Sequence, residues 1–404
     1  MPSTMSSLPV TVAPPPSGAS AGDVLDLIRS GRATTRGELV RLTGLSRTAV
    51  GARLAPLTEA GLVLEGDEES ATGGRPASTL VLNRDAGLIL AVAIGRSRCQ
   101  MSVCALDGSE LSSISHDQEV GLGPDVLMPI VIEHLRRMLA ELGRSGDEVR
   151  GVGFSLSGTV DPIRVVSVDS PALAGWDGVP LAPYVREVTS APVFIDNDCN
   201  VMALSERGGH LLSHDDVLVL KASTGIGLGI IAGGRLVQGH RGAAGELGHV
   251  KVAAAQGLRC RCGDLGCLEA VAGGWALVER LRERGQQVHH VRDLVAQAVH
   301  GNGEARAIVR ESGRRVGEAL AATVTVLNPR AVVVGGDMVG AFDTFAAGLR
   351  DTLFPATTAL AGRDLQLLPA TYGEQAGLVG CVRLALDAVL SPRAVDAALA
   401  RQRV

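Results

Sequence analysis

Few residues of this 404-residue chain are aromatic, and no stretch of it is long and apolar enough to cross a bilayer. Phe, Trp and Tyr make up 2% of the residues, so the core has to be built from Leu, Val, Ile and Ala. Residues 1–20 lack the basic start and apolar stretch of a secretory signal, and we expect a disordered tail there. These absences predict a cytoplasmic protein with no membrane partner.

The net charge of −5 does not by itself indicate nucleic acid. The length is typical of two or three domains, and the 51 glycines fit an α/β protein with many tight strand-to-helix turns. The number of cysteines, seven, is odd, and three of them lie between residues 260 and 267. In a chain without a leader this clustering favours a metal site over disulfides.

Residues 21–85 carry the pattern of a winged helix-turn-helix domain. Thr35 and Glu38 form a capping box that begins a second helix, after a first helix with apolar residues at helical spacing. A turn centred on Gly44 follows, and Ser46 caps a third helix. Two helices joined by a short glycine-containing turn are typical of a helix-turn-helix.

A β-hairpin, or wing, is predicted after the third helix. Its strands are residues 62–64 and 79–82, and the loop between them contains Gly73-Gly74-Arg75-Pro76. The Arg75 guanidinium could lie along a minor groove. Pro56 is unfavourable inside a helix, so we expect the third helix to bend or to end early at that point.

The stretch from residue 29 to residue 53 is strongly basic, with six arginines and one acid, Glu38. Arginines here would neutralise phosphates, and the first residues of the third helix would face bases. The alternative is a small helical oligomerisation domain with a solvated basic face. The predicted DNA contacts are Arg36, Arg47, Thr48, Val50, Arg53 and Arg75.

Short apolar strands alternate with helical stretches through residues 86–404, which argues for α/β architecture. Leu88–Ile94 and Met101–Leu106 are expected to pair, and Asp107-Gly108 is a turn signal. Further strands are predicted at Val149–Phe154, Val193–Ile195, Val217–Leu220, Gly229–Ile231 and Ala331–Val334.

Four stretches of this segment have distinctive sequences: GVGFSLSG at 151–158, DNDCN at 196–200, GAAGELGH at 242–249 and CRCGDLGCLE at 260–269. Together they resemble the ROK family of repressors and sugar kinases. The predicted winged helix-turn-helix ending in Gly-Gly-Arg-Pro resembles the repressor branch of that family, so the resemblance covers nearly the whole chain after residue 20.

The resemblance implies a two-lobed, actin-like (ribonuclease H-like) α/β sugar kinase fold behind the DNA-binding domain. Residues 86–200 would form the N-terminal lobe and residues 201–388 the C-terminal lobe with the metal site. The last helix of the C-terminal lobe would return to the first lobe. Residues 389–404 would form a C-terminal tail or helix.

The spacing Cys-x-Cys-x4-Cys places three thiolates within eight residues, and His249 lies eleven residues before Cys260. Zinc prefers four tetrahedral sulfur and nitrogen ligands. His249, Cys260, Cys262 and Cys267 are therefore predicted to hold a structural Zn²⁺ with no open position. The alternative is a set of buried or redox-labile cysteines.

The sugar-contacting positions of the family match Asn197, Asp198, Glu246, His249 and Glu269. In kinases of the family, the aspartate that matches Asp198 also acts as the general base towards the attacking hydroxyl. His249 would bind zinc through one ring nitrogen and offer the other nitrogen to the sugar.

The first phosphate loop of the family, Asp-x-Gly-Gly-Thr-Lys, is not conserved in this chain. Ala93 stands in place of the aspartate that organises magnesium, and Arg96 replaces a glycine that lets the backbone approach phosphate. The remaining candidate nucleotide residues are Thr224, Gly225, Gly227, Gly335 and Gly336. Tight turns need glycine in any case, so these residues are weak evidence for an ATP site. Because the first phosphate loop is also altered, ATP and magnesium are not expected as cofactors.

Two functions are compatible with these features. The favoured one is a sugar-responsive DNA-binding transcriptional regulator, a repressor of carbohydrate genes, whose partners are a double-stranded operator and a sugar or sugar-phosphate effector. A homodimer or homotetramer would suit a palindromic operator. The alternative is an ATP-dependent sugar kinase with an attached DNA-binding domain; Asp198 favours it, and Ala93 and Arg96 oppose it.

Overall fold

The structure is a computed structural model. It describes residues 18–68, 78–96, 98–117, 122–168, 170, 173, 175–209 and 214–402. The chain divides into two compact units, which are taken separately below. The smaller comprises Met1–Leu88, Ala105–Ser109 and Leu386–Val404, and the larger comprises Ile89–Cys104 and Glu110–Ala385.

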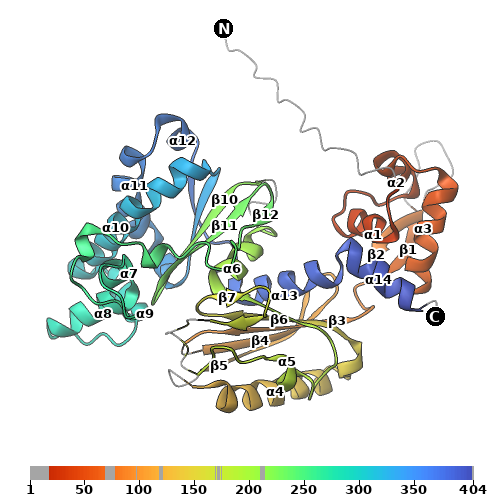
Figure 1. The fold of residues 1–404 in the computed structure, drawn as a ribbon, viewed down its shortest axis with the longest axis horizontal. Helices are drawn as coiled ribbons and strands as arrows, with labels where there is room; N and C mark the ends of the chain where they lie inside the picture. The colour runs from red at the N-terminus through yellow and green to blue at the C-terminus, as the bar shows by residue number, and fades with distance from the viewer. Residues whose placement is uncertain are drawn as a thin grey trace, which may run out of the picture. The chain divides into compact units, whose positions relative to one another are not determined.

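The smaller unit contains three helices followed by an antiparallel strand pair, in the order expected for a winged helix-turn-helix (Figure 1). The predicted caps are present: the Thr35 and Glu38 side chains form a reciprocal capping box, and Ser46 accepts from the backbone N–H of Ala49. The elements are α1 (Ala21–Arg29), α2 (Arg36–Thr43), α3 (Arg47–Glu59), β1 (Val63–Glu68) and β2 (Ser78–Leu82).

The third helix does not end at Pro56, because α3 continues to Glu59. Its buried side chains are Val50, Leu54 and Leu57, which recur at helical spacing on the face turned to the core of the unit. The helix is held to the core on both sides of the proline, and this packing offsets the hydrogen bond that proline cannot donate.

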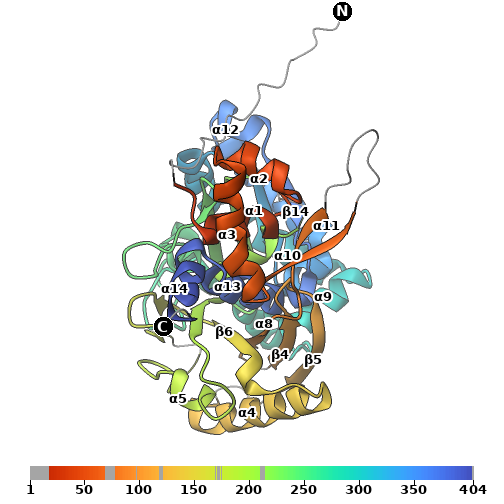
Figure 2. The same ribbon diagram turned by 90° about the vertical axis from the view of Figure 1, so that its right-hand side faces the viewer.

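The C-terminal helix α14 (Pro392–Gln402) packs against α1 within the smaller unit (Figure 2). The backbone N–H of Gly22 donates to Asp396 Oδ1 at 2.9 Å. A Cβ at position 22 would lie 2.2 Å from the carbonyl oxygen of Pro392, so this contact requires glycine. Helix α14 therefore belongs structurally with the first helix of the chain.

The larger unit is built on two five-stranded sheets. The first has the strand order β5-β4-β3-β6-β9, and Asp107-Gly108 lies between β4 and β5. The pairs β4–β5 and β6–β9 are antiparallel and parallel, respectively. The strands are β3 (Leu88–Ile94), β4 (Arg98–Ala105), β5 (Glu110–Asp117), β6 (Val149–Leu156) and β9 (Val193–Asn197).

The second sheet has the order β12-β11-β10-β13-β14, again with antiparallel strands at one side and parallel strands at the other. Repetition of one strand order in two sheets is the duplicated pattern of the actin-like fold, and the sheets are mixed. The strands are β10 (Val217–Ala222), β11 (Ile226–Ala232), β12 (Arg235–Leu236), β13 (Ala331–Gly335) and β14 (Gln366–Pro369).

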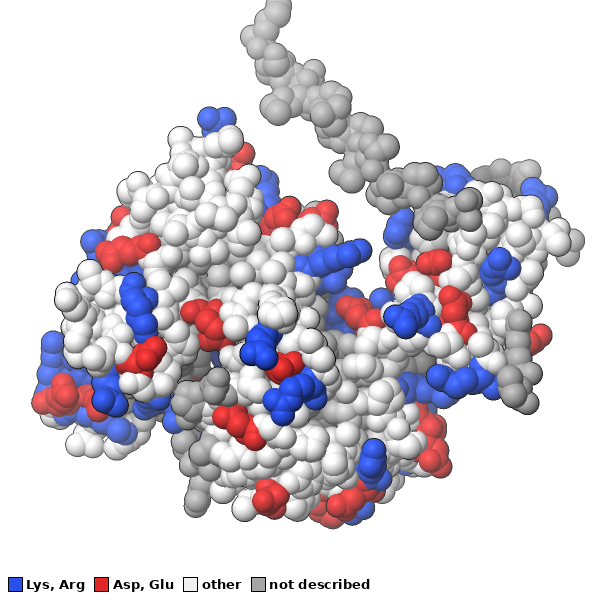
Figure 3. Space-filling view, viewed as in Figure 1, with Lys and Arg blue, Asp and Glu red and all other residues white. Residues whose placement is uncertain are grey.

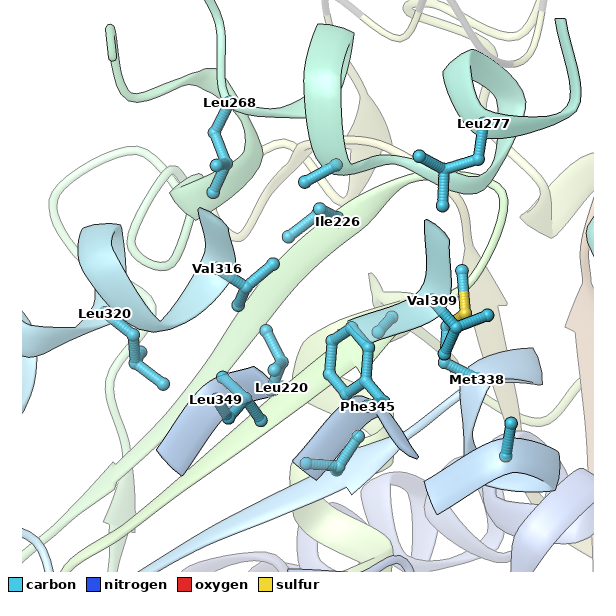
Figure 4. Packing of buried hydrophobic residues seen from close by; sticks show 14 of the residues in the cluster. Leu220, Ile226, Leu268, Leu277, Val309, Val316, Leu320, Met338, Phe345 and Leu349 are labelled. Atoms are coloured by element: carbon cyan, nitrogen blue, oxygen red, sulfur yellow. The ribbon is translucent and has the colours of Figure 1, made fainter. Parts of the chain in front are cut away.

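Helices cover both sheets (Figure 1). On the second sheet, α10 and α11 pack with each other and with the strands; Phe345 and Leu349 of α11 lie in one cluster with Leu220 of β10 and Val316 of α10 (Figure 4). The helices are α4 (Pro124–Glu141), α5 (Ala182–Val185), α6 (Asp198–Glu206), α7 (Glu269–Ala272), α8 (Gly274–Glu283), α9 (Val291–Val299), α10 (Gly303–Leu327), α11 (Phe342–Ala356), α12 (Ala359–Arg363) and α13 (Ala376–Val389).

The first sheet also receives a late segment of the chain. Helix α13 contacts it closely: the Cys381 thiol donates to the carbonyl of Val92, and a Cβ at Gly153 would lie 2.1 Å from the Cys381 carbonyl oxygen. A helix near the C-terminus thus packs on strands β3 and β6 of the first sheet. Among the described residues, no helix is long and apolar enough to span a membrane.

Candidate functional site

Asp198 lies at the start of α6, directly after β9, with a carboxylate that has three side-chain partners. Lys221 Nζ forms an ion pair with Oδ2, and Ser157 Oγ donates to the same oxygen at 2.7 Å. The Cys199 thiol lies 3.4 Å from Oδ1. The side chains of Asp198 and Lys221 are 16% and 25% exposed, so the pair is largely shielded from water.

The charges of this pair stabilise each other. Burial would raise the pKa of Asp198, but the Lys221 charge and the hydrogen bonds from Lys221 and Ser157 outweigh it and leave that pKa below its usual value. Burial would lower the pKa of Lys221, and the Asp198 charge reverses this, so the pKa of Lys221 is raised. At neutral pH the site holds a carboxylate bound to an ammonium group.

Lys221 is a site residue that the sequence reasoning missed. It is the next-to-last residue of β10, and residues 223–225 connect that strand to β11. The sequence does mark this residue, because the chain has only two lysines, Lys221 and Lys251, and Lys221 follows a run of apolar residues. A lysine inside an otherwise apolar strand needs a buried partner.

The loop after β6 joins two further predicted residues to this site. Asn197 Nδ2 donates to the Gly158 carbonyl at 2.6 Å, and Asn197 Oδ1 accepts from the N–H of Cys199 as the cap of α6. Thr159 Oγ1 donates to Glu246 Oε1 at 3.1 Å. Asn197 is thus engaged mainly in shaping the loop and the helix start.

Glu246 is partly buried, and burial raises its pKa, assisted by the negative charges of Asp198 and Glu269. Both of these carboxylates therefore lie within electrostatic range of Glu246. Glu269 is held on both oxygens: Oε2 accepts from the N–H of Ile226 at 3.0 Å and Oε1 from Trp275 Nε1 at 2.9 Å. Its direct role is to hold the glycine-rich loop against α8.

The four predicted metal ligands converge. One ligand atom from each of His249, Cys260, Cys262 and Cys267 lies within 4.8 Å of all the others. Cys262 Sγ is 3.7 Å from Cys267 Sγ, and Cys260 Sγ is 3.8 Å from His249 Nδ1. Zn–S bonds of about 2.3 Å in a tetrahedron separate the sulfur atoms by about 3.8 Å. The distances and the donor set therefore fit a four-coordinate metal.

Two neighbours link the metal-ligand cluster to its surroundings. Lys251 Nζ donates to Cys267 Sγ at 3.0 Å and to Asp264 Oδ2 at 2.9 Å, and so ties one cysteine of the cluster to a neighbouring loop residue. His249 presents Nδ1 to the cysteines and Nε2 towards Glu246 Oε2, 3.8 Å away. The histidine therefore stands between the metal-ligand cluster and the carboxylates.

The glycines of the candidate nucleotide loops are explained by packing. A Cβ at Gly225 would lie 2.7 Å from Glu269 Oε2, one at Gly227 2.4 Å from Cys199 Sγ, and one at Gly335 2.2 Å from Met202 Sδ. Gly336 has a φ of +83°. The backbone conformation at Gly336 therefore favours glycine, and the other three glycines lie in close contact with side chains of the domain.

Three further positions of the two phosphate loops are Thr224, Ala93 and Arg96. Thr224 offers its carbonyl to the N–H of Trp275. Ala93 is buried on β3, and Arg96 follows the same strand. Arg96 and Thr224 both line one cavity.

The predicted DNA contacts differ in where the structure places them. Arg47 and Thr48 are exposed on the first turn of α3. Val50 was wrongly predicted to contact bases, because it is 1% exposed and packs with Leu54 on the inner face of that helix.

The other arginines have partners within the unit. Arg36 forms an ion pair with Glu65, and Arg53 Nε donates to the Ala19 carbonyl at 3.0 Å. Arg75 lies outside the described residues. On the face drawn in Figure 3, basic and acidic side chains are intermixed.

Two mixed sheets of matching order, a carboxylate site and a Cys/His cluster define a two-lobed domain of the sugar kinase type. The chain belongs to the ROK family, whose model matches residues 89–388.

Three similar proteins illustrate the range of the family. The xylose repressor of Bacillus spizizenii (strain ATCC 23059 / NRRL B-14472 / W23) is 25% identical over 354 residues, which cover 87% of this chain and 91% of the repressor. A solved ROK family transcriptional regulator, a homologue of the E. coli Mlc protein, is 24% identical and has a TM-score of 0.80. The match covers 94% of this chain and 98% of the regulator's chain. A ROK glucokinase from Streptomyces griseus, solved with glucose and AMPPNP, is 28% identical and has a TM-score of 0.63. The match covers 74% of this chain and 99% of the glucokinase chain.

A double-mutant cycle on Asp198 and Lys221 tests the ion pair. Asp198→Asn and Lys221→Met each leave one shielded charge unpaired, so each is expected to lower the free energy of unfolding by about 1–3 kcal/mol. The double variant should lose less than the sum, with a coupling of about 1–2 kcal/mol. Urea unfolding followed by tryptophan fluorescence measures this, because Trp176 and Trp275 both lie in the larger unit.

The pair's pH dependence follows from the two pKa shifts. The lowered pKa of Asp198 gives stability that is lost as pH falls through its folded value, and the raised pKa of Lys221 gives stability that is lost as pH rises through its folded value. The coupling should be constant from about pH 5 to pH 9. The exposed pair Arg284–Glu304 is the control and should couple by less than about 1 kcal/mol. Strictly additive effects at Asp198 and Lys221 would contradict the ion pair.

Proposed function

We propose that the protein is a sugar-responsive, DNA-binding transcriptional repressor whose kinase-like domain binds sugar without phosphorylating it. The observation that carries this proposal is the likeness to a xylose repressor over 91% of that protein and 87% of this chain, whereas the likeness to the glucokinase covers 74% of this chain. The Asp198–Lys221 pair and the altered phosphate loop support the absence of phosphoryl transfer.

The DNA interface is assigned to the first turn of α3. Arg47 and Thr48 are exposed there, and within the described residues no ion pair is recorded for Arg47. In a helix-turn-helix this turn enters the major groove. Arg47 would contact phosphate or a guanine edge. Arg36 and Arg53 belong to the same basic segment, but their side chains already bind Glu65 and the Ala19 carbonyl, respectively.

The sugar site is assigned to the carboxylates around Asp198. Sugar hydroxyls are recognised by rigid carboxylate and imidazole groups, and Asp198, Glu246 and His249 offer such groups with fixed partners. Lys221 would add a donor to the same site. Glu269 would act by positioning the Ser223–Gly227 loop, because both of its oxygens already accept hydrogen bonds from the protein.

A general base for phosphoryl transfer has to accept a proton from the attacking hydroxyl. An aspartate whose pKa is lowered by an adjacent ammonium is a weaker base than a free one, and proton transfer by a placed base is worth about 10²–10⁴ in rate. Ala93 also removes the carboxylate that would organise magnesium, on which phosphoryl transfer depends. Both changes argue against the kinase alternative.

The Cys/His cluster is proposed to hold a structural Zn²⁺. His249, Cys260, Cys262 and Cys267 would be its ligands, and four protein ligands leave no position for catalysis. Bound zinc would fix the ring of His249 with Nε2 turned to Glu246. The metal would thereby fix the position of one side chain of the proposed sugar site without contacting the sugar itself.

Sugar binding can change DNA affinity only if the two states of the repressor bind sugar with different affinity. A hinge between the two lobes of the kinase-like domain is the element that such binding would bias. A homodimer would place two α3 helices on a palindromic operator, so a change in their spacing would change affinity.

Arg47→Ala is expected to weaken operator binding about tenfold and to reduce the salt slope by about one. Fluorescence anisotropy with genomic fragments selected by the purified protein measures both. Arg401→Ala, an exposed arginine of α14 in the same unit, is the control and should bind as the unchanged protein does. Equal affinity of the Arg47 variant at several salt concentrations would remove this residue from the interface.

Sugar response is tested by repeating that titration with a panel of pentoses, hexoses and amino sugars, without nucleotide. One sugar should change operator affinity by about fivefold or more, and Asp198→Asn should abolish this change while sparing DNA binding. An effect that requires Mg-ATP, or that persists in the Asp198 variant, would overturn the assignment of the site.

Cys262→Ser is expected to remove the bound metal, because a hydroxyl does not replace a thiolate as a zinc ligand. Elemental analysis of the purified protein should find about one zinc per chain, and far less in the variant. Cys104→Ser, in β4 of the first sheet, is the matched control and should retain the metal. A full zinc content in the Cys262 variant would rule out the proposed ligand set.

A further inference from the structure

Asp196 is a buried carboxylate near the end of β9, two residues before Asp198. The residue is 2% exposed. Its Oδ1 accepts from the N–H of Asn197 at 2.7 Å and from Asn200 Nδ2 at 2.8 Å. Both donors belong to the first turn of α6 and its cap, so Asp196 fixes the turn of the chain that carries Asp198.

Gln238 binds the same carboxylate from the second lobe. It follows β12, and its Nε2 donates to Asp196 Oδ2 at 2.7 Å. Burial raises the pKa of Asp196, and the Gln238 amide is one of three hydrogen-bond donors that act against this rise. Removal of a donor from a buried carboxylate costs free energy. The bond therefore holds β9 of the first sheet to the segment that follows β12 of the second sheet.

Gln238 begins a loop, residues 238–246, that reaches across to the first lobe and is called the crossing loop below. Glu246, at the end of the loop, accepts from Thr159 Oγ1 at 3.1 Å. In the middle of the loop, a Cβ at Gly242 would lie 1.9 Å from the carbonyl oxygen of Val160. Both first-lobe partners lie in the segment that follows β6. The crossing loop thus contacts the first lobe at its start, middle and end.

Gln238 also closes the crossing loop on itself. Its carbonyl accepts from the N–H of Ala244 at 3.1 Å. At the next residue, Gly245, a Cβ would lie 1.8 Å from the carbonyl oxygen of Leu228 in β11, so the loop is packed closely at this end as well. The position of Glu246 therefore depends on a residue that binds both the crossing loop and the turn of Asp198.

We propose that Gln238 is a positioning residue of the sugar site, which holds the crossing loop with Glu246 against the turn that carries Asp198. This inference rests on the sugar response proposed above and adds a residue that acts through Asp196. A sugar bound between the two carboxylates needs both at a fixed separation, because acceptors placed in advance lower the cost of binding. Loss of the bond between Gln238 and Asp196 would free the loop and lower the affinity for sugar.

Calorimetry of the full chain with pentoses, hexoses and amino sugars tests this role. Gln238→Ala and Gln238→Asn should each weaken binding of the responding sugar by about tenfold or more. The first variant lacks the amide, and the second is one methylene too short to reach Asp196. Gln256→Ala, at an exposed position of the same lobe, is the matched control and should bind the sugar as the unchanged protein does.

Gln238→Glu separates this role from general damage to the loop, and it serves also if Gln238→Ala does not fold. Its new carboxyl group would face Asp196, and two such groups share a proton at low pH and repel each other once both are ionised. Sugar affinity should be near that of the unchanged protein at about pH 5 and fall by about tenfold or more towards about pH 8. The same series on the unchanged protein accounts for the ionisable neighbours that both proteins share: Asp198, His240, Arg241, Glu246 and Cys381.

Three distinguishable results would overturn the proposal. If no sugar gives heat with the unchanged protein, the sugar response fails and the role of Gln238 fails with it. If a sugar binds equally well to the unchanged protein and to Gln238→Ala, the sugar response stands and only the role of Gln238 is lost. If Gln238→Glu loses the same affinity at about pH 5 and about pH 8, the loss does not come from the contact with Asp196.

Discussion

The ion pair between Asp198 and Lys221 is the interaction on which the chemistry of this domain depends. It joins the start of α6, after the last strand of the first sheet, to strand β10 of the second sheet. Because neither side chain is more than a quarter exposed, removing one charge would leave the other without a partner. The carboxylate of Asp198 is thereby tied both to the Lys221 ammonium and to the Ser157 hydroxyl.

The other carboxylates and the histidine near this ion pair are also held by fixed contacts. Glu269 holds the glycine-rich loop, Glu246 is tied to Thr159, and His249 connects Glu246 to the three cysteines. Glycines that resemble phosphate-binding residues lie in close contact with Glu269 and other neighbours.

Local signals in the sequence were sufficient for much of this structure. The caps at Thr35 and Ser46 mark helix starts through side-chain contacts to nearby backbone, and the Cys-x-Cys-x4-Cys spacing brings its own ligands together. Residues whose roles depend on distant partners were missed or misjudged. Lys221 is explained only by Asp198, 23 residues earlier, and Val50 lies on the inner face of α3 because of tertiary packing.

The central claim is most directly tested by NMR of protein labelled with ¹³C at lysine Cε, since the chain has only Lys221 and Lys251 to assign. The account predicts that the pKa of Lys221 lies above the ordinary lysine value, that Asp198→Asn removes this shift, and that the effector sugar perturbs the same signal. A pKa of Lys221 at or below the ordinary value, unaffected by Asp198→Asn, would contradict the ion pair and the function built on it.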